Sequence, residues 1–185
     1  MEKILFINAC VRLSSRTLDL AKHVLSKLSG RVEEVKLYNE QLLPLGLEEM
    51  ELRDKSAKSK DFSNSLFNHA KQFADADIIV IAAPYWDLMF PAVVKSYFEN
   101  ITVNGLTFAY SENGIPCGLC KAKKLIYVTT SGGFIKDNFG FDYVSALAKN
   151  FYGINDVQLV KAEGLDVYGA DASSIIEKAK IKFNA

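Results

Sequence analysis

The sequence predicts an α/β protein in which helices cover both faces of a parallel β-sheet. Short apolar runs alternate along the chain with longer segments of helical period. The run "DIIVIA" at 77–82 is apolar without alternation, which is typical of a strand buried on both faces. A length of 185 residues suits one domain, so we expect a single domain over residues 1–185.

Five strands and five helices are expected. The strands cover Lys3–Asn8, Val32–Leu37, Asp77–Ala82, Lys124–Thr129 and Asp156–Ala162. Pro91 suits a helix start, because the N–H that proline lacks is not needed there. The helices cover Ser15–Leu28, Asp61–Ala74, a segment that begins at Pro91, about Asp142–Phe151 and about Ala172–Phe183.

Two segments lack a clean period. Residues 39–60 carry many charges and are interpreted as a long loop with room for one short helix. Residues 103–121 contain Gly105, Asn113-Gly114 and Gly118, which indicates an irregular hairpin. Because crossovers are right-handed, few topologies remain, and the flavodoxin-like strand order 2-1-3-4-5 fits five strands and this length. We therefore expect a three-layer sandwich of that type.

Composition excludes several classes of function. Lys plus Arg and Asp plus Glu each number 22, so the formal net charge is zero, which argues against a nucleic-acid partner and a polybasic membrane anchor. The longest apolar run, Ile78–Pro84, is too short to span a bilayer. Three cysteines are too few for a disulfide framework and favour a reducing compartment, so a cytoplasmic location is expected.

Three loops follow predicted strands at the edge of the sheet where ligands bind in such folds. The first, around residues 8–17, offers the hydroxyls of Ser14, Ser15 and Thr17, the guanidinium groups of Arg12 and Arg16, and the free N–H groups of a helix start. Hydroxyls, guanidinium groups and a helix N-terminus all favour an anion such as phosphate. A capping loop with two solvated arginines explains the same residues equally well.

The other two loops would suit the rest of a flat ligand. "PYWDLMFP", residues 84–91, is too apolar for a solvated loop, although it could also form local core. "TTSGGF", residues 129–134, places two glycines after a strand, where a backbone can approach a ligand or simply turn. A phosphate end, an aromatic shelf and a backbone-lined edge together match the anatomy of FMN.

At this point the chain resembles the FMN-dependent NADH-azoreductases and NAD(P)H:quinone oxidoreductases of flavodoxin-like fold. The resemblance runs almost from end to end. It is carried by "APYWDLMFPAVVKSYFENITVNGLTFAYSENG" at 83–114, "LIYVTTSGG" at 125–133 and "YGINDVQLVKAEG" at 152–164.

The resemblance implies a site and a reaction. FMN would receive two electrons from NADH or NADPH and pass them to a quinone or azo compound in a ping-pong order, with no catalytic side chain and no metal. A homodimer is implied, in which Tyr110 of the partner subunit covers the flavin, and Phe134 helps to shape the substrate slot. The implied cofactor-binding residues are Ser15, Arg16 and Thr17 at the phosphate, Tyr85, Trp86, Asp87 and Leu88 along the ring, Thr130, Ser131, Gly132 and Gly133 at its edge, and Cys10 and Pro84 beside them.

Some residues depart from the family pattern. The family often has serine where this chain has Cys10, asparagine at Asp87, and a Ser-Arg pair at Thr130-Ser131. Such differences bear on how the flavin is tuned and on which nicotinamide is used.

Two other functions share some of these features. A flavodoxin-like electron carrier without its own NAD(P)H activity would share the fold, but zero net charge and the long excursion at 103–121 argue against it. A low-molecular-weight phosphatase is suggested by the spacing of Cys10 and Arg16, followed by Thr17. That family also takes its general acid from an Asp-Pro pair. The four prolines here follow Leu43, Ala83, Phe90 and Ile115, so this chain has no Asp-Pro pair, which argues against a phosphatase. Cys117 and Cys120 form C-x-x-C without the second pair that a zinc site needs.

Overall fold

A five-stranded parallel sheet in the order β2-β1-β3-β6-β7 forms the centre of the computed structural model, which describes residues 1–42 and 44–183. Counted along the chain among these strands, the order is 2-1-3-4-5, so the predicted flavodoxin-like topology is confirmed. The strands are β1 (Lys3–Asn8), β2 (Arg31–Lys36), β3 (Ile78–Ala82), β6 (Lys124–Thr130) and β7 (Asp156–Ala162).

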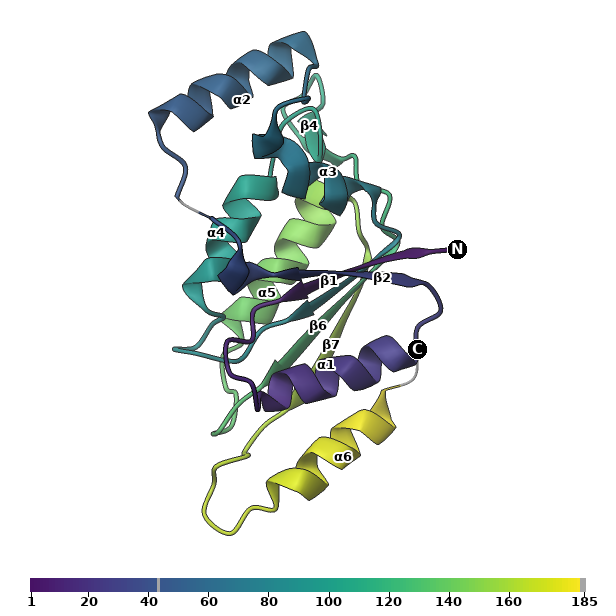
Figure 1. Ribbon diagram of the computed structural model, residues 1–185, viewed down its shortest axis with the longest axis vertical. Coiled ribbons are helices and arrows are strands. Elements are labelled where there is room, and N and C mark those ends of the chain that lie inside the picture. Colours follow the sequence, from purple (N-terminus) through teal and green to yellow (C-terminus); the bar gives the residue numbers. More distant parts are fainter. Residues whose placement is uncertain (43, 184–185) are drawn as a thin grey trace.

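Helices cover both faces of this sheet (Figure 1). Side chains alternate across each strand, so Ile4 and Phe6 of β1 belong to one buried cluster and Leu5 and Ile7 to the other. The first cluster includes residues of α1 (Arg16–Ser26) and α6 (Ala172–Lys182), and the second includes residues of α3 (Asn68–Asp75), α4 (Ala92–Ile101) and α5 (Phe139–Leu147).

The strand register brings the loops of the site together. Asn8 at the end of β1 pairs with Ala82 at the end of β3, and Ala82 pairs with Val128 near the end of β6. Neighbouring parallel strands therefore end at the same edge, and the segments that follow them begin side by side. Two helix starts fit the predictions: the Ser15 side chain caps α1 by accepting from the N–H of Leu18, and Pro91 immediately precedes α4.

The segment 39–60, predicted as a long loop with room for one short helix, contains one helix, which is longer than expected. Residues Leu47–Ser59 form α2, a helix of 13 residues whose only buried member is Ser56. Figure 1 shows α2 lying outside the helix layer that contains α3 and α4, away from the sheet, which explains why it has no apolar stripe. Acidic residues in its first turn and Lys58 in its last turn suit the helix dipole, and Arg53 donates to the carbonyl oxygens of Glu99 and Thr102 near the end of α4.

Among the other helix boundaries, two differ most from those predicted. The helix expected over Asp61–Ala74 begins at Asn68, after the short 3₁₀ turn Ser65–Phe67. The Asn64 side chain caps that turn by accepting from the N–H of Leu66, so helical structure begins after Asn64 and not at Asp61. The helix expected to end near Phe151 stops at Leu147 and continues as a π-helical turn, Ala148–Tyr152.

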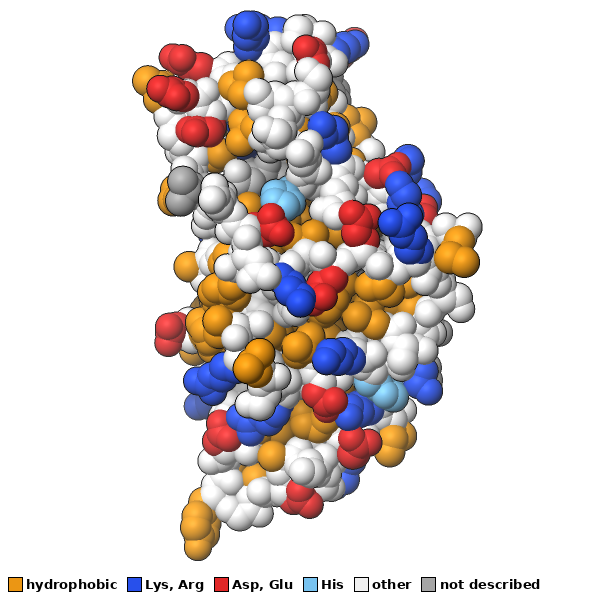
Figure 2. All heavy atoms as spheres, viewed as in Figure 1, with side chains coloured by type: hydrophobic (Ala, Val, Ile, Leu, Met, Phe, Trp, Pro, Cys, Tyr) orange, Lys and Arg blue, Asp and Glu red, His pale blue; other side chains and the backbone are white. Residues whose placement is uncertain are grey.

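The excursion at 103–121 contains the predicted hairpin, formed by β4 (Phe108–Tyr110) and β5 (Pro116–Gly118) as an antiparallel pair. Its second strand lies directly against the π-helical turn. Figure 2 shows basic and acidic side chains interspersed over the visible face, as expected for a chain with zero net charge.

Candidate functional site

Segments that follow four neighbouring strands enclose a cavity of about 250 Å³ at the carboxyl edge of the sheet. The cavity combines hydroxyl and guanidinium groups with an aromatic wall. Its lining residues are Cys10, Val11, Arg12, Ser14, Ser15, Arg16 and Thr17 after β1, Pro84, Tyr85 and Trp86 after β3, Thr130, Ser131 and Gly132 at the end of β6, and Asp166 after β7.

Polar groups dominate one end of this cavity. The hydroxyls of Thr17 and Thr130 lie 2.6 Å apart, so the first turn of α1 is joined to the end of β6. Both residues are buried, and neither hydroxyl is left without a partner. Arg16, the first residue of α1, extends its guanidinium toward the loop after β7. Hydroxyls, a guanidinium and the N-terminus of α1 are groups that favour an anion.

Aromatic side chains form the other wall. The N–H of Tyr85 donates to the carbonyl of Thr130 at 3.0 Å, and the Tyr85 hydroxyl donates to the carbonyl of Asp137 at 2.8 Å. Trp86 is 39% exposed and therefore has a large apolar surface available to a ligand.

A strained turn supports this wall. Trp86 and Met89 exchange two backbone hydrogen bonds, of 2.9 and 2.8 Å, around the tight turn at Asp87 and Leu88. Both turn residues are left-handed, with φ of 48° and 69°, although neither is glycine. A left-handed conformation costs about 1–2 kcal/mol at a residue with a Cβ, and strain of this kind concentrates at functional sites.

The structure brings most of the predicted cofactor-binding residues together and leaves others outside. Asp87, Leu88 and Gly133 are neighbours of lining residues but do not line the cavity. Tyr110 lines a different cavity, of about 500 Å³, between α2 and the ends of α4 and α5. Phe134 is 71% exposed, and its ring lies beside Gly164, where an added Cβ would be 3.0 Å from the ring. Within one chain, neither predicted substrate residue completes the cavity.

Sequence reasoning missed Asp166. Its carboxylate binds Arg16 with two hydrogen bonds, Nη1 to Oδ1 at 2.9 Å and Nη2 to Oδ2 at 3.1 Å. Arg16 holds the pKa of this carboxyl below its usual range, mainly through the hydrogen bond. The available signal was positional, because β7 is also a strand of the parallel sheet and the segment after it must reach the same edge.

Cys10 is not poised as a nucleophile. Burial raises the pKa of its thiol, and a hydrogen bond with Ser15 opposes that shift only in part. A phosphatase cysteine reacts as a thiolate and needs a lowered pKa. The shift therefore disfavours the phosphatase interpretation of the Cys10 and Arg16 spacing.

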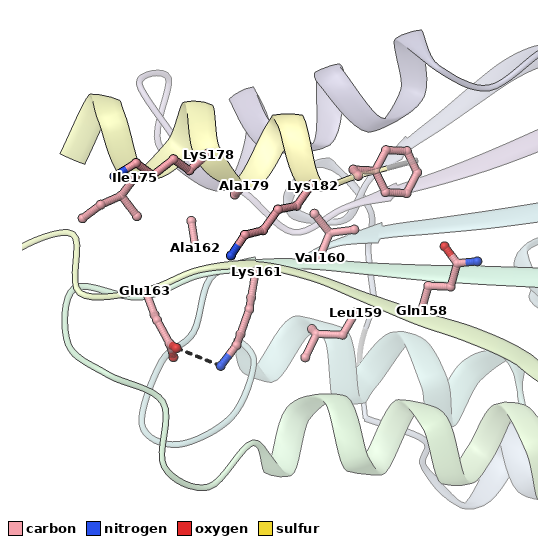
Figure 3. A pocket seen from close by; sticks show the side chains of 11 residues that line it. Gln158, Leu159, Val160, Lys161, Ala162, Glu163, Ile175, Lys178, Ala179 and Lys182 are labelled. Carbon is pink, nitrogen blue, oxygen red and sulfur yellow. Dashed lines mark hydrogen bonds and ion pairs between the residues drawn. The ribbon is translucent and has the colours of Figure 1, made fainter. Parts of the chain in front are cut away.

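A larger cavity of about 700 Å³ lies elsewhere, between α6 and the edge strand β7 (Figure 3). Ile175 and Ala179 of α6 face Val160 and Ala162 of β7, and an ion pair between two lining residues joins Lys161 to Glu163 at 2.9 Å. The described residues that line it include no Ser, Thr, Cys, His, Tyr or Arg. Size alone therefore does not identify the functional site.

The smaller cavity at the carboxyl edge suits a phosphorylated flavin. Arg16 pairs with an anionic group there, the Asp166 carboxylate, which shows that its guanidinium is accessible to an anion from this edge. Across residues 1–42 and 44–183, no three His, Cys, Asp or Glu side chains gather as they would around a metal ion. In the same part of the chain, every helix is too short or too polar to cross a membrane.

Comparison with known proteins identifies the family to which the chain belongs. Residues 2–185 match a family described by its flavodoxin-like fold. The FMN-dependent NADH:quinone oxidoreductase of Coprothermobacter proteolyticus is 35% identical over 192 residues, covering 97% of this chain and 94% of that protein. The corresponding protein of Lachnoclostridium phytofermentans is 35% identical over 196 residues, covering 98% and 96%.

Solved structures of azoreductases have the same fold as this chain. An azoreductase from Bacillus anthracis superposes with a TM-score of 0.84 at 25% identity, covering 98% of this chain and 96% of that one. An FMN-dependent NADH-azoreductase from the same species, solved in complex with FMN, superposes with a TM-score of 0.81 at 25% identity, covering 98% and 95%. With its strand order, its cavity at the carboxyl edge and these full-length relatives, the chain belongs to the flavodoxin-like family of FMN-dependent NADH:quinone oxidoreductases and azoreductases.

Proposed function

We propose that this protein is an FMN-dependent oxidoreductase that transfers two electrons from NADH or NADPH to quinones or azo compounds. One observation carries the proposal. A cavity with a hydroxyl- and guanidinium-rich end and an aromatic wall lies at the carboxyl edge of the sheet, in a chain that matches FMN-dependent NADH:quinone oxidoreductases along its length. When bound, FMN would supply the redox chemistry by accepting a hydride from the nicotinamide and passing it to the acceptor.

The polar end of the cavity would hold the phosphate. Ser15, Arg16 and Thr17 lie at the start of α1, where unpaired N–H groups and the helix dipole favour a negative charge. Because Thr17 also bonds Thr130 across the cavity, the phosphate end and the edge of β6 would move as one unit. Cys10 and Ser14 line the same end and would contact the chain that links the phosphate to the ring.

The aromatic wall would hold and orient the ring. Pro84, Tyr85 and Trp86 would lie along one face, and Thr130, Ser131 and Gly132 would border the pyrimidine edge. Gly133 continues that edge, and Asp87 and Leu88 form the turn beyond Trp86. Because hydrogen bonds fix the left-handed turn, its backbone groups would keep their positions beside the ring when the cofactor binds. No side chain needs to act as a nucleophile, which agrees with the raised pKa of the Cys10 thiol.

We further propose a homodimer that completes the substrate slot. Tyr110 is 55% exposed, and Phe108, Phe151 and Met50 border the same cavity between α2 and the ends of α4 and α5. An aromatic side chain this exposed on a hairpin is suited to a partner subunit. Tyr110 of one subunit, with Phe134 of the other, would then cover the nicotinamide and the acceptor in turn. Donor and acceptor would share one slot, so ping-pong kinetics are expected.

We infer that one domain spanning residues 1–185 carries this activity and that it works in the cytoplasm. Residues of β1, β3, β6 and β7 contribute to both buried clusters, which favours one cooperative unit. The three cysteines are free, as is usual in a reducing compartment.

The test measures reduction of the bound flavin by each nicotinamide and then steady-state turnover of an acceptor. Protein reconstituted with FMN is mixed without oxygen with NADH and, separately, with NADPH, and the flavin absorbance is followed. We expect bleaching with at least one donor and steady-state turnover with menadione and methyl red. A yellow protein that neither donor bleaches would refute the mechanism. Bleaching by a donor without turnover of either acceptor would instead favour an electron carrier. Sedimentation as a monomer would refute the role of Tyr110.

A further inference from the structure

The guanidinium of Arg16 is held by the loop after β7. Its Nη1 and Nη2 atoms make two parallel hydrogen bonds to the two carboxylate oxygens of Asp166, at 2.9 and 3.1 Å. Nη1 also donates to the carbonyl of Leu165 at 3.4 Å. Paired contacts of this kind are the geometry in which arginine binds carboxylate or phosphate most specifically.

Backbone bonds fix the position of Asp166. The segment after β7 is joined to the segment after β6 by three hydrogen bonds: Gly164 to Gly133 at 2.9 Å, Leu165 to Ser131 at 3.2 Å and Asp166 to Gly132 at 2.9 Å. The carboxylate lies directly over Gly132, where an added Cβ would be 2.4 Å from Oδ2. Asp166 is therefore placed by the fold, and Arg16 reaches across the cavity to meet it.

The carboxylate is negative in the cavity that would receive a phosphate. Arg16 and Arg12 both favour its ionised form, so Asp166 is charged at neutral pH. A phosphate monoester carries between one and two negative charges at that pH, and it would meet an acidic side chain beside its arginine. A guanidinium has five N–H donors, and the contacts to Asp166 and Leu165 occupy three of them.

We propose that Asp166 is a specificity-determining residue that competes with the cofactor phosphate for the Arg16 guanidinium. The inference rests on the proposed function, because the phosphate in question is that of FMN. The carboxylate keeps Arg16 paired in the cofactor-free protein, and binding of FMN must recover part of that guanidinium from Asp166. The competition lowers the affinity for FMN and leaves the affinity for riboflavin, which has no phosphate, unchanged. A contact outside the ring site thereby weakens the retention of the cofactor.

The test compares two flavins on one variant. The dissociation constants of FMN and riboflavin are measured by flavin fluorescence for the cofactor-free wild type and Asp166→Asn, at low and high salt. The amide preserves the shape of the side chain and removes its charge. We expect Asp166→Asn to bind FMN roughly fivefold more tightly at low salt, with a smaller gain at high salt and no change for riboflavin. Unchanged riboflavin binding also shows that the variant is folded.

The matched control is Glu177→Gln on α6, which changes the net charge equally and removes a carboxylate bonded to Lys180 rather than to Arg16. It should leave both affinities unchanged. Equal or weaker FMN binding by Asp166→Asn, an equal gain for riboflavin, or the same gain in Glu177→Gln would overturn the competition. A wild type that binds neither flavin would overturn the proposed function as well, so the two failures are distinguishable.

A second arm tests the mechanism through Arg16. In an Arg16→Met background the guanidinium is absent, and competition for it cannot occur. Adding Asp166→Asn there should tighten FMN binding by less than half of its effect in the wild type. A gain of full size in that background would mean that Asp166 acts by simple repulsion, and the proposed competition would be wrong.

Discussion

Replacing Gly118 by alanine should destabilise the protein through a clash between two backbones. Gly118 ends β5, where the hairpin passes over the π-helical turn Ala148–Tyr152. A Cβ at this position would lie 2.1 Å from the carbonyl carbon of Tyr152, 2.3 Å from its oxygen and 2.2 Å from the nitrogen of Gly153. These are main-chain atoms, so no rotamer change can relieve the contact. Either the hairpin or the π-helical turn must shift by about 1 Å.

The expected cost follows from that geometry. Overpacking typically costs about 1–3 kcal/mol, and a contact made only by main-chain atoms places this variant near 3 kcal/mol in free energy of unfolding. For a chain of this length the melting temperature should fall by about 6–12 °C. Urea unfolding gives the free energy, and differential scanning calorimetry gives the melting temperature. Because the hairpin carries Tyr110, we also expect a higher KM for the acceptor.

The control is Gly133→Ala. An added Cβ at Gly133 meets nothing within 4 Å, and its φ lies outside the left-handed range, so stability should change by less than about 0.5 kcal/mol. If Gly118→Ala were as stable as this control, the close approach of β5 to the π-helical turn would be wrong, and so would the placement of the hairpin.

Three further predictions concern the site and the thiols. Asp87→Asn keeps a side chain that tolerates the left-handed φ of 48° and removes a charge that the proposed function places near the ring, so the FMN midpoint potential should rise by about 30 mV in spectroelectrochemical titration; an unchanged potential would contradict this. Thr17→Val leaves the buried Thr130 hydroxyl unpaired and should cost about 1–3 kcal/mol in urea unfolding, whereas adding Thr130→Val should recover part of that loss rather than add to it. Burial raises the pKa of Cys120 to about 12 and keeps its thiol protonated, so iodoacetamide at pH 8 should label exposed Cys117 and spare Cys120 until urea is added; equal labelling rates by mass spectrometry would rule out the buried environment of Cys120.

Local pattern was enough to predict the sheet and the loops at its edge. Strands buried on both faces must be apolar throughout, so "DIIVIA" could be assigned without knowledge of its neighbours. Parallel strands end at a common edge, and therefore Ser15, Trp86 and Gly132 could be placed in one site from their positions after strands. The assignment of that site to FMN depended on family resemblance as well.

Features that depend on distant parts of the chain could not be predicted. Helix α2 lies away from the sheet and contacts α4 through hydrogen bonds from Arg53. It therefore has no apolar stripe, and its hydrophobic pattern gave no signal for a helix. The left-handed turn at Asp87 and Leu88 is closed by the hydrogen bonds between Trp86 and Met89. Aspartate tolerates this conformation but leucine does not favour it, so the local sequence gave no clear signal for the turn.

The sequence by itself determined which segments are buried and which loops carry donors, because burial and hydrogen-bonding capacity belong to individual residues. Tertiary structure alone decided which of those donors are hydrogen-bonded to other groups of the protein. Arg16 and Asp166 are separated by 150 positions, and only the meeting of the segments after β1 and β7 at one edge pairs their charges. Charge interactions depend on distance in space, and a sequence pattern does not contain that distance.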